Sequence, residues 1–429
     1  MSLTYASRLL LKFTPVDATK TKCSSYGLML ASGLIQQTGK GIFAFLPVGQ
    51  RILDKTIRLI EKELNDAGAQ KCTLPALGNE ELWSKCGRWN VYGTQLFRLE
   101  DRMKRQLCLQ PTCEEMITDI AAQFGVFKAE SLPMLIYQTT EKFRDEMSPR
   151  FGLLRSRHFH MNDLYSFDRT EEDAVQTYQR ISDIYRKIFV EQLGLTETLV
   201  LTADAKEMGG NISHEYHLPN ESAEDRLMVC RNCLSVRTVG EVENKACAKC
   251  DGEEEMLNSV EIGHTFQLGS KYSRVFNARS SDQIPYFMCC FGIGVTRLIA
   301  ASIDVLSPST TAIRLPNAIA PFKLAIVLPK TKEDHPSMRF ARDFSHQLAS
   351  SPSFHGDVLV DDRTSKSVGR RLVELNQLGI PNILVVPAKK SANPNDLIEL
   401  EYFKAHPRND QLDLVGLFSH RDVFQLLQH

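Results

Sequence analysis

The sequence predicts a two-domain protein, with an α+β domain built on an antiparallel sheet followed by a smaller α/β domain. Two alternating apolar runs on either side of an arginine-rich loop predict a long hairpin over residues 138–168. A helical pattern covers 171–193, and strand patterns cover 261–272 and 285–291. After a proline-containing linker at 302–321, strands and helices alternate, which is typical of an α/β domain.

Composition sets broad limits on the protein class. The chain has 429 residues, of which 43% are hydrophobic and 24% charged, as in an ordinary globular enzyme. No apolar run is long enough to span a membrane. The formal net charge of -1 gives no overall attraction to nucleic acid, so RNA would have to be held by local basic patches. An odd number of cysteines, eleven, favours reduced thiols inside a cell over a disulfide framework.

The N-terminal segment 1–24 has the composition of a mitochondrial transit peptide. It carries four basic residues, several Ser and Thr, an apolar patch at 9–13 and a single acid, Asp17. The alternative is an N-terminal segment with no targeting role. Further along, an amphipathic helix is expected from residue 49 to about 66, with Gly68 as its stop and a strand ending at Pro75.

The loop Pro111-Thr112-Cys113-Glu114-Glu115 places a hydroxyl and a carboxylate two residues apart. On an extended backbone Thr112 and Glu114 point to the same side and could grip an ammonium group. The alternative is a helix start, with Thr112 as N-cap and Glu115 at the capping-box position.

The hairpin carries four arginines near its tip, Arg144, Arg150, Arg155 and Arg157. Planar, permanently charged guanidinium groups at this density suit a polyphosphate. A surface hairpin with scattered charge is the alternative. Another indication of a nucleotide site is Gly292-Ile293-Gly294, which lies between a strand and a helix with Arg297 in its first turn. Glycines allow close approach of the backbone to a nucleotide, and a guanidinium group can stack on a base.

Two Cys-x-x-Cys pairs are separated by thirteen residues, and their members are Cys230, Cys233, Cys247 and Cys250. This spacing is close to that of a four-thiolate zinc site. Such a site would be structural, since four thiolates leave no open position for catalysis. The alternative is a set of thiols that binds no metal.

In the C-terminal domain, strands are expected at 322–328, 358–360, 382–386 and 412–417. The helices between them are expected at 337–349, 367–378 and 419–427. Basic residues of this domain are candidate RNA contacts, although a solvated helix face is nearly as good an explanation for any one of them. They are Arg363, Lys366, Arg370 and Arg371.

Taken together, the hairpin and the stretches 111–115, 261–269 and 292–297 resemble the catalytic core of a class II aminoacyl-tRNA synthetase. Their identity and order resemble a prolyl-tRNA synthetase of bacterial or mitochondrial type. The resemblance implies a catalytic domain over 25–318 and an anticodon-binding domain over 320–429. It also implies a homodimer formed through the 49–75 region. The chain has room only for a small Cys-rich insertion at 218–258, where many bacterial relatives carry a large editing domain, so no editing in cis is expected.

The resemblance also implies roles for individual residues. Catalytic roles fall to Arg144, Arg297 and Glu114. The proline pocket would be formed by Thr112, Glu114, Arg144, Met161, Asp163, His264, Phe266 and Cys290. ATP would be bound by Arg144, Glu146, Arg155, Ser156, Phe159, Glu261, His264 and Arg297. Glu261 would hold Mg²⁺ against the phosphates.

The expected activity is the ligation of L-proline to tRNA(Pro) through prolyl-adenylate, in the mitochondrial matrix, with ATP as substrate. Two alternatives stay open. One is a catalytically retired synthetase paralogue that serves as a nucleic-acid-binding subunit, which would be expected to have lost residues such as Arg144 and Glu261. The other is a synthetase for threonine, glycine or histidine.

Overall fold

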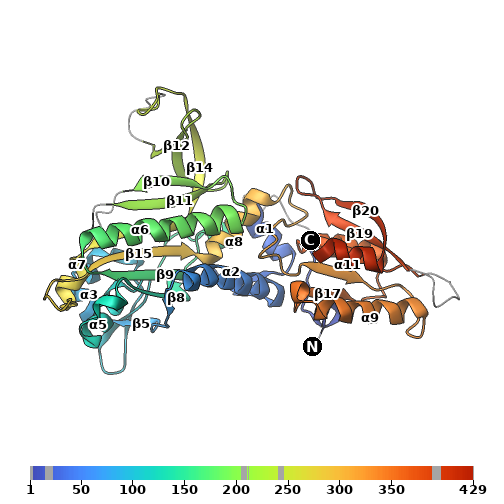
Figure 1. The fold of residues 1–429 in the computed structure, drawn as a ribbon, viewed down its shortest axis with the longest axis horizontal. Coiled ribbons are helices and arrows are strands. Elements are labelled where there is room, and N and C mark those ends of the chain that lie inside the picture. Colours follow the sequence, from blue (N-terminus) through green and yellow to red (C-terminus); the bar gives the residue numbers. More distant parts are fainter. Residues whose placement is uncertain are drawn as a thin grey trace. The chain divides into compact units, whose positions relative to one another are not determined.

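The computed structural model of the chain divides into two packing units, each built around its own sheet (Figure 1). It describes residues 3–14, 23–203, 210, 212–239, 246–388 and 398–428. The first unit comprises 38–43 and 56–301, and the second comprises 302–429 together with 1–37 and 44–55. None of the described helices is both long and apolar enough to cross a membrane.

The first unit contains a nine-stranded sheet in the order β10-β11-β14-β15-β9-β8-β4, with β12 and β13 attached beside β14. Every described pairing in it is antiparallel except that of β4 with β8. The strands are β4 Gln70–Lys71, β8 Met134–Phe143, β9 His158–Asp168, β10 Leu199–Ala203, β11 Ser213–Pro219, β12 Asp225–Cys230, β13 Val236–Thr238, β14 Glu254–Gly269 and β15 Phe287–Gly294. The predicted hairpin is the β8–β9 pair, which closes at Phe143 and His158.

The remaining elements of this unit flank the sheet. A three-stranded sheet contains β5 Leu77–Asn79, β7 Gln106–Leu109 and β6 Arg98–Glu100, in that order. The helices are α3 Glu80–Lys85, α4 Arg88–Val91, α5 Glu114–Phe124, α6 Glu171–Arg186 and α7 Lys271–Phe276. Helices α2 Pro47–Asp66 and α8 Val295–Leu306 and the hairpin of β2 Ile35–Gly39 with β3 Ile42–Phe45 contribute residues to both units.

Helix α6 lies along the large sheet and packs against β9, β14 and β15 (Figure 1). It begins where predicted, because Thr170 accepts a hydrogen bond from the backbone N–H of Asp173 and the first turn is acidic, which suits the positive end of the helix dipole. The α-helix ends at Arg186 and continues as a π-helical segment to Gln192. Buried aromatic contacts, such as Tyr178 on Phe291, fix it to the sheet.

The helix at the Thr112 loop differs from the capping-box alternative. Its first residue is Glu114, its N-cap is Cys113, and no side chain caps it. Thr112 instead donates its hydroxyl to the Glu114 carboxylate, at 2.7 Å and 2.8 Å from the two oxygens. The hydroxyl and carboxylate therefore lie together as predicted, but not on an extended loop, because Glu114 is already the first residue of α5.

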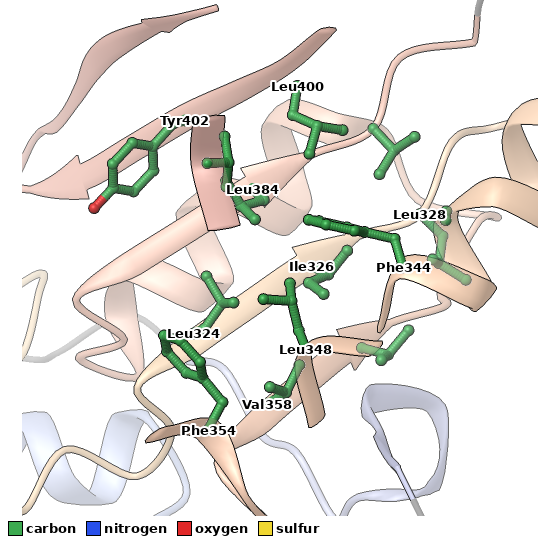
Figure 2. Packing of buried hydrophobic residues seen from close by; sticks show 14 of the residues in the cluster. Leu324, Ile326, Leu328, Phe344, Leu348, Phe354, Val358, Leu384, Leu400 and Tyr402 are labelled. Atoms are coloured by element: carbon green, nitrogen blue, oxygen red, sulfur yellow. The ribbon is translucent and has the colours of Figure 1, made fainter. Parts of the chain in front are cut away.

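The second unit contains a six-stranded sheet in the order β1-β17-β16-β18-β19-β20. Its first four strands are parallel and the last two antiparallel. They are β1 Thr4–Tyr5, β16 Leu324–Val327, β17 Val358–Asp361, β18 Asn382–Val385, β19 Glu399–Ala405 and β20 Leu412–Ser419. The helices are α1 Ser24–Ala31, α9 Pro336–Ser350, α10 Val368–Gln377 and α11 His420–Gln428. Figure 2 shows the core, in which Ile326, Val358 and Leu384 of the sheet meet Phe344 and Leu348 of α9.

The C-terminal strands and helices were predicted closely, with two exceptions. The sequence pattern missed β19 and the N-terminal strand β1. The predicted linker at 302–321 is also shorter than expected, because α8 continues to Leu306.

Part of the predicted transit segment forms structure. Residues 1–2 and 15–22 lie outside the described residues. Thr4 and Tyr5 pair with β17, and Ser7 donates both its backbone N–H and its hydroxyl to Asp362, at 2.9 Å and 2.6 Å. These contacts make residues 4–7 the edge of the second unit's sheet.

Arg371 was expected to contact RNA, and this expectation is wrong. Its side chain is fully buried and donates to the backbone oxygens of Leu328, at 2.8 Å, and Asp361, at 3.0 Å. We expect Arg371→Ala to lower the free energy of unfolding of this unit by about 2–4 kcal/mol. The substitution leaves a cavity and removes a buried donor from two backbone oxygens, of which that of Asp361 still accepts from the Leu328 N–H. The neighbouring, largely exposed Arg370 is the matched control. Its loss should cost only about 0–1 kcal/mol, because the buried Glu374 keeps Arg363 and Lys366 as partners. Urea unfolding of both variants measures the difference, and equal losses would contradict the assignment.

Candidate active site

Two adjoining cavities in the first unit lie over the central strands of the nine-stranded sheet. The larger has a volume of about 310 Å³ and the smaller about 200 Å³. Five residues line both cavities. One directly follows β8 and the others belong to β9, β14 and β15: Arg144, Met161, Glu261, His264 and Gly292. The shared wall means that one ligand with two parts could occupy both cavities, with its junction at Arg144.

The structure brings the predicted site residues together in two groups. Every residue predicted to bind proline lines the smaller cavity: Thr112, Glu114, Arg144, Met161, Asp163, His264, Phe266 and Cys290. Every residue predicted to bind ATP lines the larger: Arg144, Glu146, Arg155, Ser156, Phe159, Glu261, His264 and Arg297. Of the four hairpin arginines, Arg150 and Arg157 line neither cavity.

A buried ion cluster forms one end of the smaller cavity. Arg88 donates to Glu114 at 3.0 Å and to Glu115 at 2.7 Å, and all three side chains are almost fully buried. Burial raises the pKa of Glu115, although the charge of Arg88 opposes this. Arg88 also lies over the ring of Trp83. The cluster fixes the Glu114 carboxylate at the cavity, where it can bind a cationic amine. No sequence pattern pointed to Arg88, which lies in the short helix α4 outside the motifs described above.

The wall of the smaller cavity is apolar and its base is a saturated polar network. His264 stacks on Phe266 with ring centroids 3.8 Å apart, beside Cys290. At the base, Asp163 accepts hydrogen bonds from Lys142 at 2.8 Å and from Gln138 and Tyr165. These three donors engage both oxygens of Asp163, which fixes this carboxylate at the base of the pocket.

The larger cavity gathers cationic groups. The Arg144 guanidinium lies 5.3 Å from the centroid of the Phe159 ring, and its buried Nε has no hydrogen-bond partner among the residues that the structure describes. Arg297 donates to the backbone oxygens of Leu154 and Glu261, each at 2.9 Å. Burial and the like charge of Arg144 lower the pKa of Arg297, against the opposing charge of Glu261. Like charges held together in this way favour an anionic ligand.

Glu261 places a carboxylate between the two cavities. Although desolvation raises its pKa, a hydrogen bond of 3.0 Å from His264 and the charge of Arg297 lower it to about 2. His264 is held in turn by Ser213, at 2.6 Å. Glu261 is therefore ionised at neutral pH and offers the oxygen donor that a hard cation such as Mg²⁺ prefers.

Glu224 and Asp225 also line the larger cavity, and the sequence pattern did not single them out. Glu224 accepts a hydrogen bond from Arg155 at 2.7 Å and forms an ion pair with Arg150. Arg155 donates to Glu146 as well, at 3.0 Å. Two carboxylates thus hold the Arg155 guanidinium at the cavity.

The four cysteines of the two Cys-x-x-Cys pairs form a cluster outside both cavities. Their sulfur atoms all lie within 4.8 Å of one another, with Cys230 and Cys250 at 3.5 Å and Cys233 and Cys247 at 3.6 Å. These distances are far longer than a disulfide bond. A tetrahedral zinc with bonds of about 2.3 Å places its sulfur ligands about 3.8 Å apart, so the cluster fits this ion.

Comparisons with known proteins agree with this site. Residues 97–306 match the model of the tRNA synthetase class II core domain (G, H, P, S and T). The chain is 39% identical to a probable mitochondrial proline--tRNA ligase of Rattus norvegicus, over 88% of this chain and 80% of that protein. It is 34% identical to the proline--tRNA ligase of Ehrlichia chaffeensis, over 88% and 90% of the two chains.

Among solved structures, the fold resembles that of the Giardia lamblia prolyl-tRNA synthetase in complex with prolyl-adenylate. The TM-score is 0.74 at 21% identity, covering 97% of this chain and 76% of the other. The extent and identity of the sequence matches go well beyond the shared fold. The chain therefore belongs to the class II aminoacyl-tRNA synthetases and, within them, to the proline--tRNA ligase family.

Proposed function

We propose that this chain ligates L-proline to tRNA(Pro) in two steps, first forming prolyl-adenylate from ATP and then transferring the prolyl group to the tRNA. The observation that carries the proposal is the position of Arg144 in the wall shared by a small amine-binding cavity and a larger cationic one. Solved relatives hold prolyl-adenylate or AMPPNP, which agrees with a site of this kind.

In the first step the proline carboxylate attacks the α-phosphate of ATP, the bond from this phosphorus to the bridging oxygen breaks, and pyrophosphate leaves. The carboxylate is ionised at neutral pH, so no general base is needed, and the protein acts by positioning and by stabilising charge. Thr112 and Glu114 bind the proline amine. Arg144 binds the carboxylate and the α-phosphate, so it holds both reacting groups.

The remaining residues position ATP in the larger cavity. Phe159 and Arg297 hold the adenine ring between them, Glu146 accepts from its amino group, and Arg155 binds the γ-phosphate. Ser156 contributes a wall hydroxyl. Glu261 would hold Mg²⁺, which would supply positive charge to the phosphates, and His264 orients this carboxylate.

The wider assignment extends to partners and location. The partner is tRNA(Pro), with the second unit as the proposed anticodon-binding domain and α2 as part of a homodimer interface. A structural Zn²⁺ at the four clustered thiolates completes the bound groups. The named mitochondrial relatives favour a mitochondrial protein, and we place it in the matrix. The transit peptide stays a prediction. Mass spectrometry of the mature N-terminus tests this prediction. If the chain is cleaved after residue 24, the mature protein lacks β1; if Thr4 and Tyr5 are retained, the prediction is wrong.

Amino-acid-dependent ATP–pyrophosphate exchange tests the proposed function. Proline alone among the twenty amino acids should support exchange at full rate. Exchange with threonine, glycine or histidine would assign another substrate. No exchange with any of them would favour the retired-paralogue alternative, although that alternative does not explain why every predicted ATP-binding and proline-binding residue lines a cavity.

Alanine should be charged measurably by this chain. Apolar side chains, such as Phe266, Met161 and Cys290, form part of the wall of this pocket, and a hydrophobic pocket discriminates by only about 1–3 kcal/mol for each methylene group that a substrate lacks. The module at 218–258 is too small for an editing domain. We therefore expect purified protein to accumulate alanyl-tRNA(Pro), measured by acid-gel analysis. Rapid hydrolysis of added alanyl-tRNA(Pro) by this chain alone would contradict the prediction.

A further inference from the structure

The small module that carries the four cysteines has too little apolar material to hold its own shape. Strand β12, strand β13 and the first part of β14 extend beyond β10 and β11 (Figure 1). The local hydrophobic cluster has three buried residues, Leu201, Leu227 and Val229. Modules with so small a core generally need a metal or a disulfide for a fixed fold.

The backbone around the cysteines has the form of two matching knuckles. The residues that follow the second cysteine of each pair, Leu234 and Asp251, both have a φ near +55°. In each knuckle an amide N–H points at the first sulfur: Cys233 donates to Cys230 at 3.5 Å, and Lys249 donates to Cys247 at 3.4 Å. Donation to sulfur stabilises a thiolate, so both loops are arranged to hold four metal-binding sulfurs.

The same two strands that hold the cysteines reach the nucleotide cavity. Strand β12 begins at Asp225 in the cavity wall and ends at Cys230, while β14 runs without a break from Glu254, opposite Cys230, to Glu261 and His264. The turn before β12 is tied to β14, because the N–H of Asn220 donates to the backbone oxygen of Asn258 at 2.9 Å. This turn ends at Glu224, which holds Arg155 at 2.7 Å.

We propose that Zn²⁺ at Cys230, Cys233, Cys247 and Cys250 fixes β12 against β14 and thereby positions Glu224, which orients Arg155 for the phosphates of ATP. A guanidinium group has five donors. Glu224 and Glu146 each bind one of its terminal nitrogens, which leaves other N–H groups for phosphate. A pre-oriented arginine binds its ligand more tightly than a freely moving one. The inference rests on the proposed function only in taking ATP as the ligand of this cavity.

Metal content and nucleotide binding of the full-length chain test the proposal. Protein purified without chelator should contain about one zinc ion per chain, and cobalt substitution should give the absorption of tetrahedral thiolate coordination. Removing zinc should raise the Kd for ATP, measured by calorimetry without proline, by at least about tenfold. The Kd for proline should change by less than about twofold, and added zinc should restore ATP binding.

Two variants separate the metal from the carboxylate. Cys233→Ser should lose zinc and weaken ATP binding, while Cys72→Ser, at a half-buried thiol outside the module, should do neither. Glu224→Gln should keep zinc but weaken ATP binding; tighter binding would show that Glu224 competes with phosphate and would overturn the proposal. The proposal would also be overturned if the purified protein contained no zinc, or if the Kd for ATP did not change when zinc is removed. If the zinc-loaded chain shows no proline-dependent exchange, the proposed function fails instead, independently of the metal results.

Discussion

Arg144→Ala is expected to lower kcat/KM for proline-dependent ATP–pyrophosphate exchange by at least about a thousandfold. The loss of one well-placed donor to a developing negative charge typically costs about a hundredfold to a thousandfold in rate. A larger loss is expected for Arg144, because it lines both cavities and is proposed to bind both reacting groups. The measurement is exchange at saturating ATP and varied proline, followed by the reverse titration.

The matched control is Arg105→Ala, at an exposed arginine that pairs with Asp101 on the β6–β7 turn. It removes the same side chain without touching either cavity, so exchange should stay close to that of the unaltered chain. If Arg144→Ala lowered kcat/KM by less than about tenfold, Arg144 would not stabilise the transition state as proposed. Circular dichroism of both variants excludes unfolding as the cause.

Arg88→Met is expected to damage both stability and proline binding. The replacement keeps much of the volume but leaves Glu114 and Glu115 buried side by side without a counter-charge. Breaking a buried ion pair in this way costs about 3–5 kcal/mol of unfolding free energy. One of the two carboxylates is then expected to bind a proton, which weakens its attraction for the proline amine and raises KM for proline.

Three further variants separate a positioning role of Arg88 from simple destabilisation. Arg88→Lys keeps the charge and should retain part of the affinity for proline. The double variant Arg88→Met with Glu115→Gln should recover stability, because a single buried carboxylate remains. Glu114→Gln in the unaltered background should raise KM for proline and leave KM for ATP unchanged. If Arg88→Met left proline KM unaltered at a temperature where it is folded, the positioning role would be excluded.

Local patterns in the sequence predicted the arginine hairpin and the Thr112–Glu114 pair, whereas other site residues, such as Asp163 and Cys290, were implied by the family resemblance alone. The hairpin could be recognised because alternation on both arms fixes which residues face the same side, and the closing pair Phe143 and His158 then brings Arg144 and Phe159 together. The Thr112 and Glu114 pair could also be predicted from local sequence, since two residues that are two positions apart need no tertiary contact to be neighbours.

The parts that the sequence missed depend on contacts between distant segments. Arg88 meets Glu114 across 26 positions, and nothing near Arg88 marks it as a partner of a buried carboxylate. Glu224 was overlooked because it lies on a turn whose place is set by β12 pairing with β14. That pairing also starts β14 at Glu254, although its first residues are too polar to suggest a strand.

Arg371 shows the opposite error. It lies in a helix among basic residues, and composition alone cannot tell a surface charge from one that faces the core. In the structure, its neighbours Lys366 and Arg370 pair with Glu374, while Arg371 is directed inward to two backbone oxygens. Helix phase relative to the sheet decides the difference, and phase is a tertiary property.

A structure of this chain with a non-hydrolysable prolyl-adenylate analogue tests most directly whether proline and the nucleotide meet at Arg144. The proline ring should occupy the smaller cavity with its amine at Glu114, and the adenine should lie between Phe159 and Arg297. The prolyl carbonyl group of the analogue and the group that replaces its phosphate should both lie next to Arg144. An analogue bound with its proline end away from Glu114, or with its phosphate group out of reach of Arg144, would contradict the account.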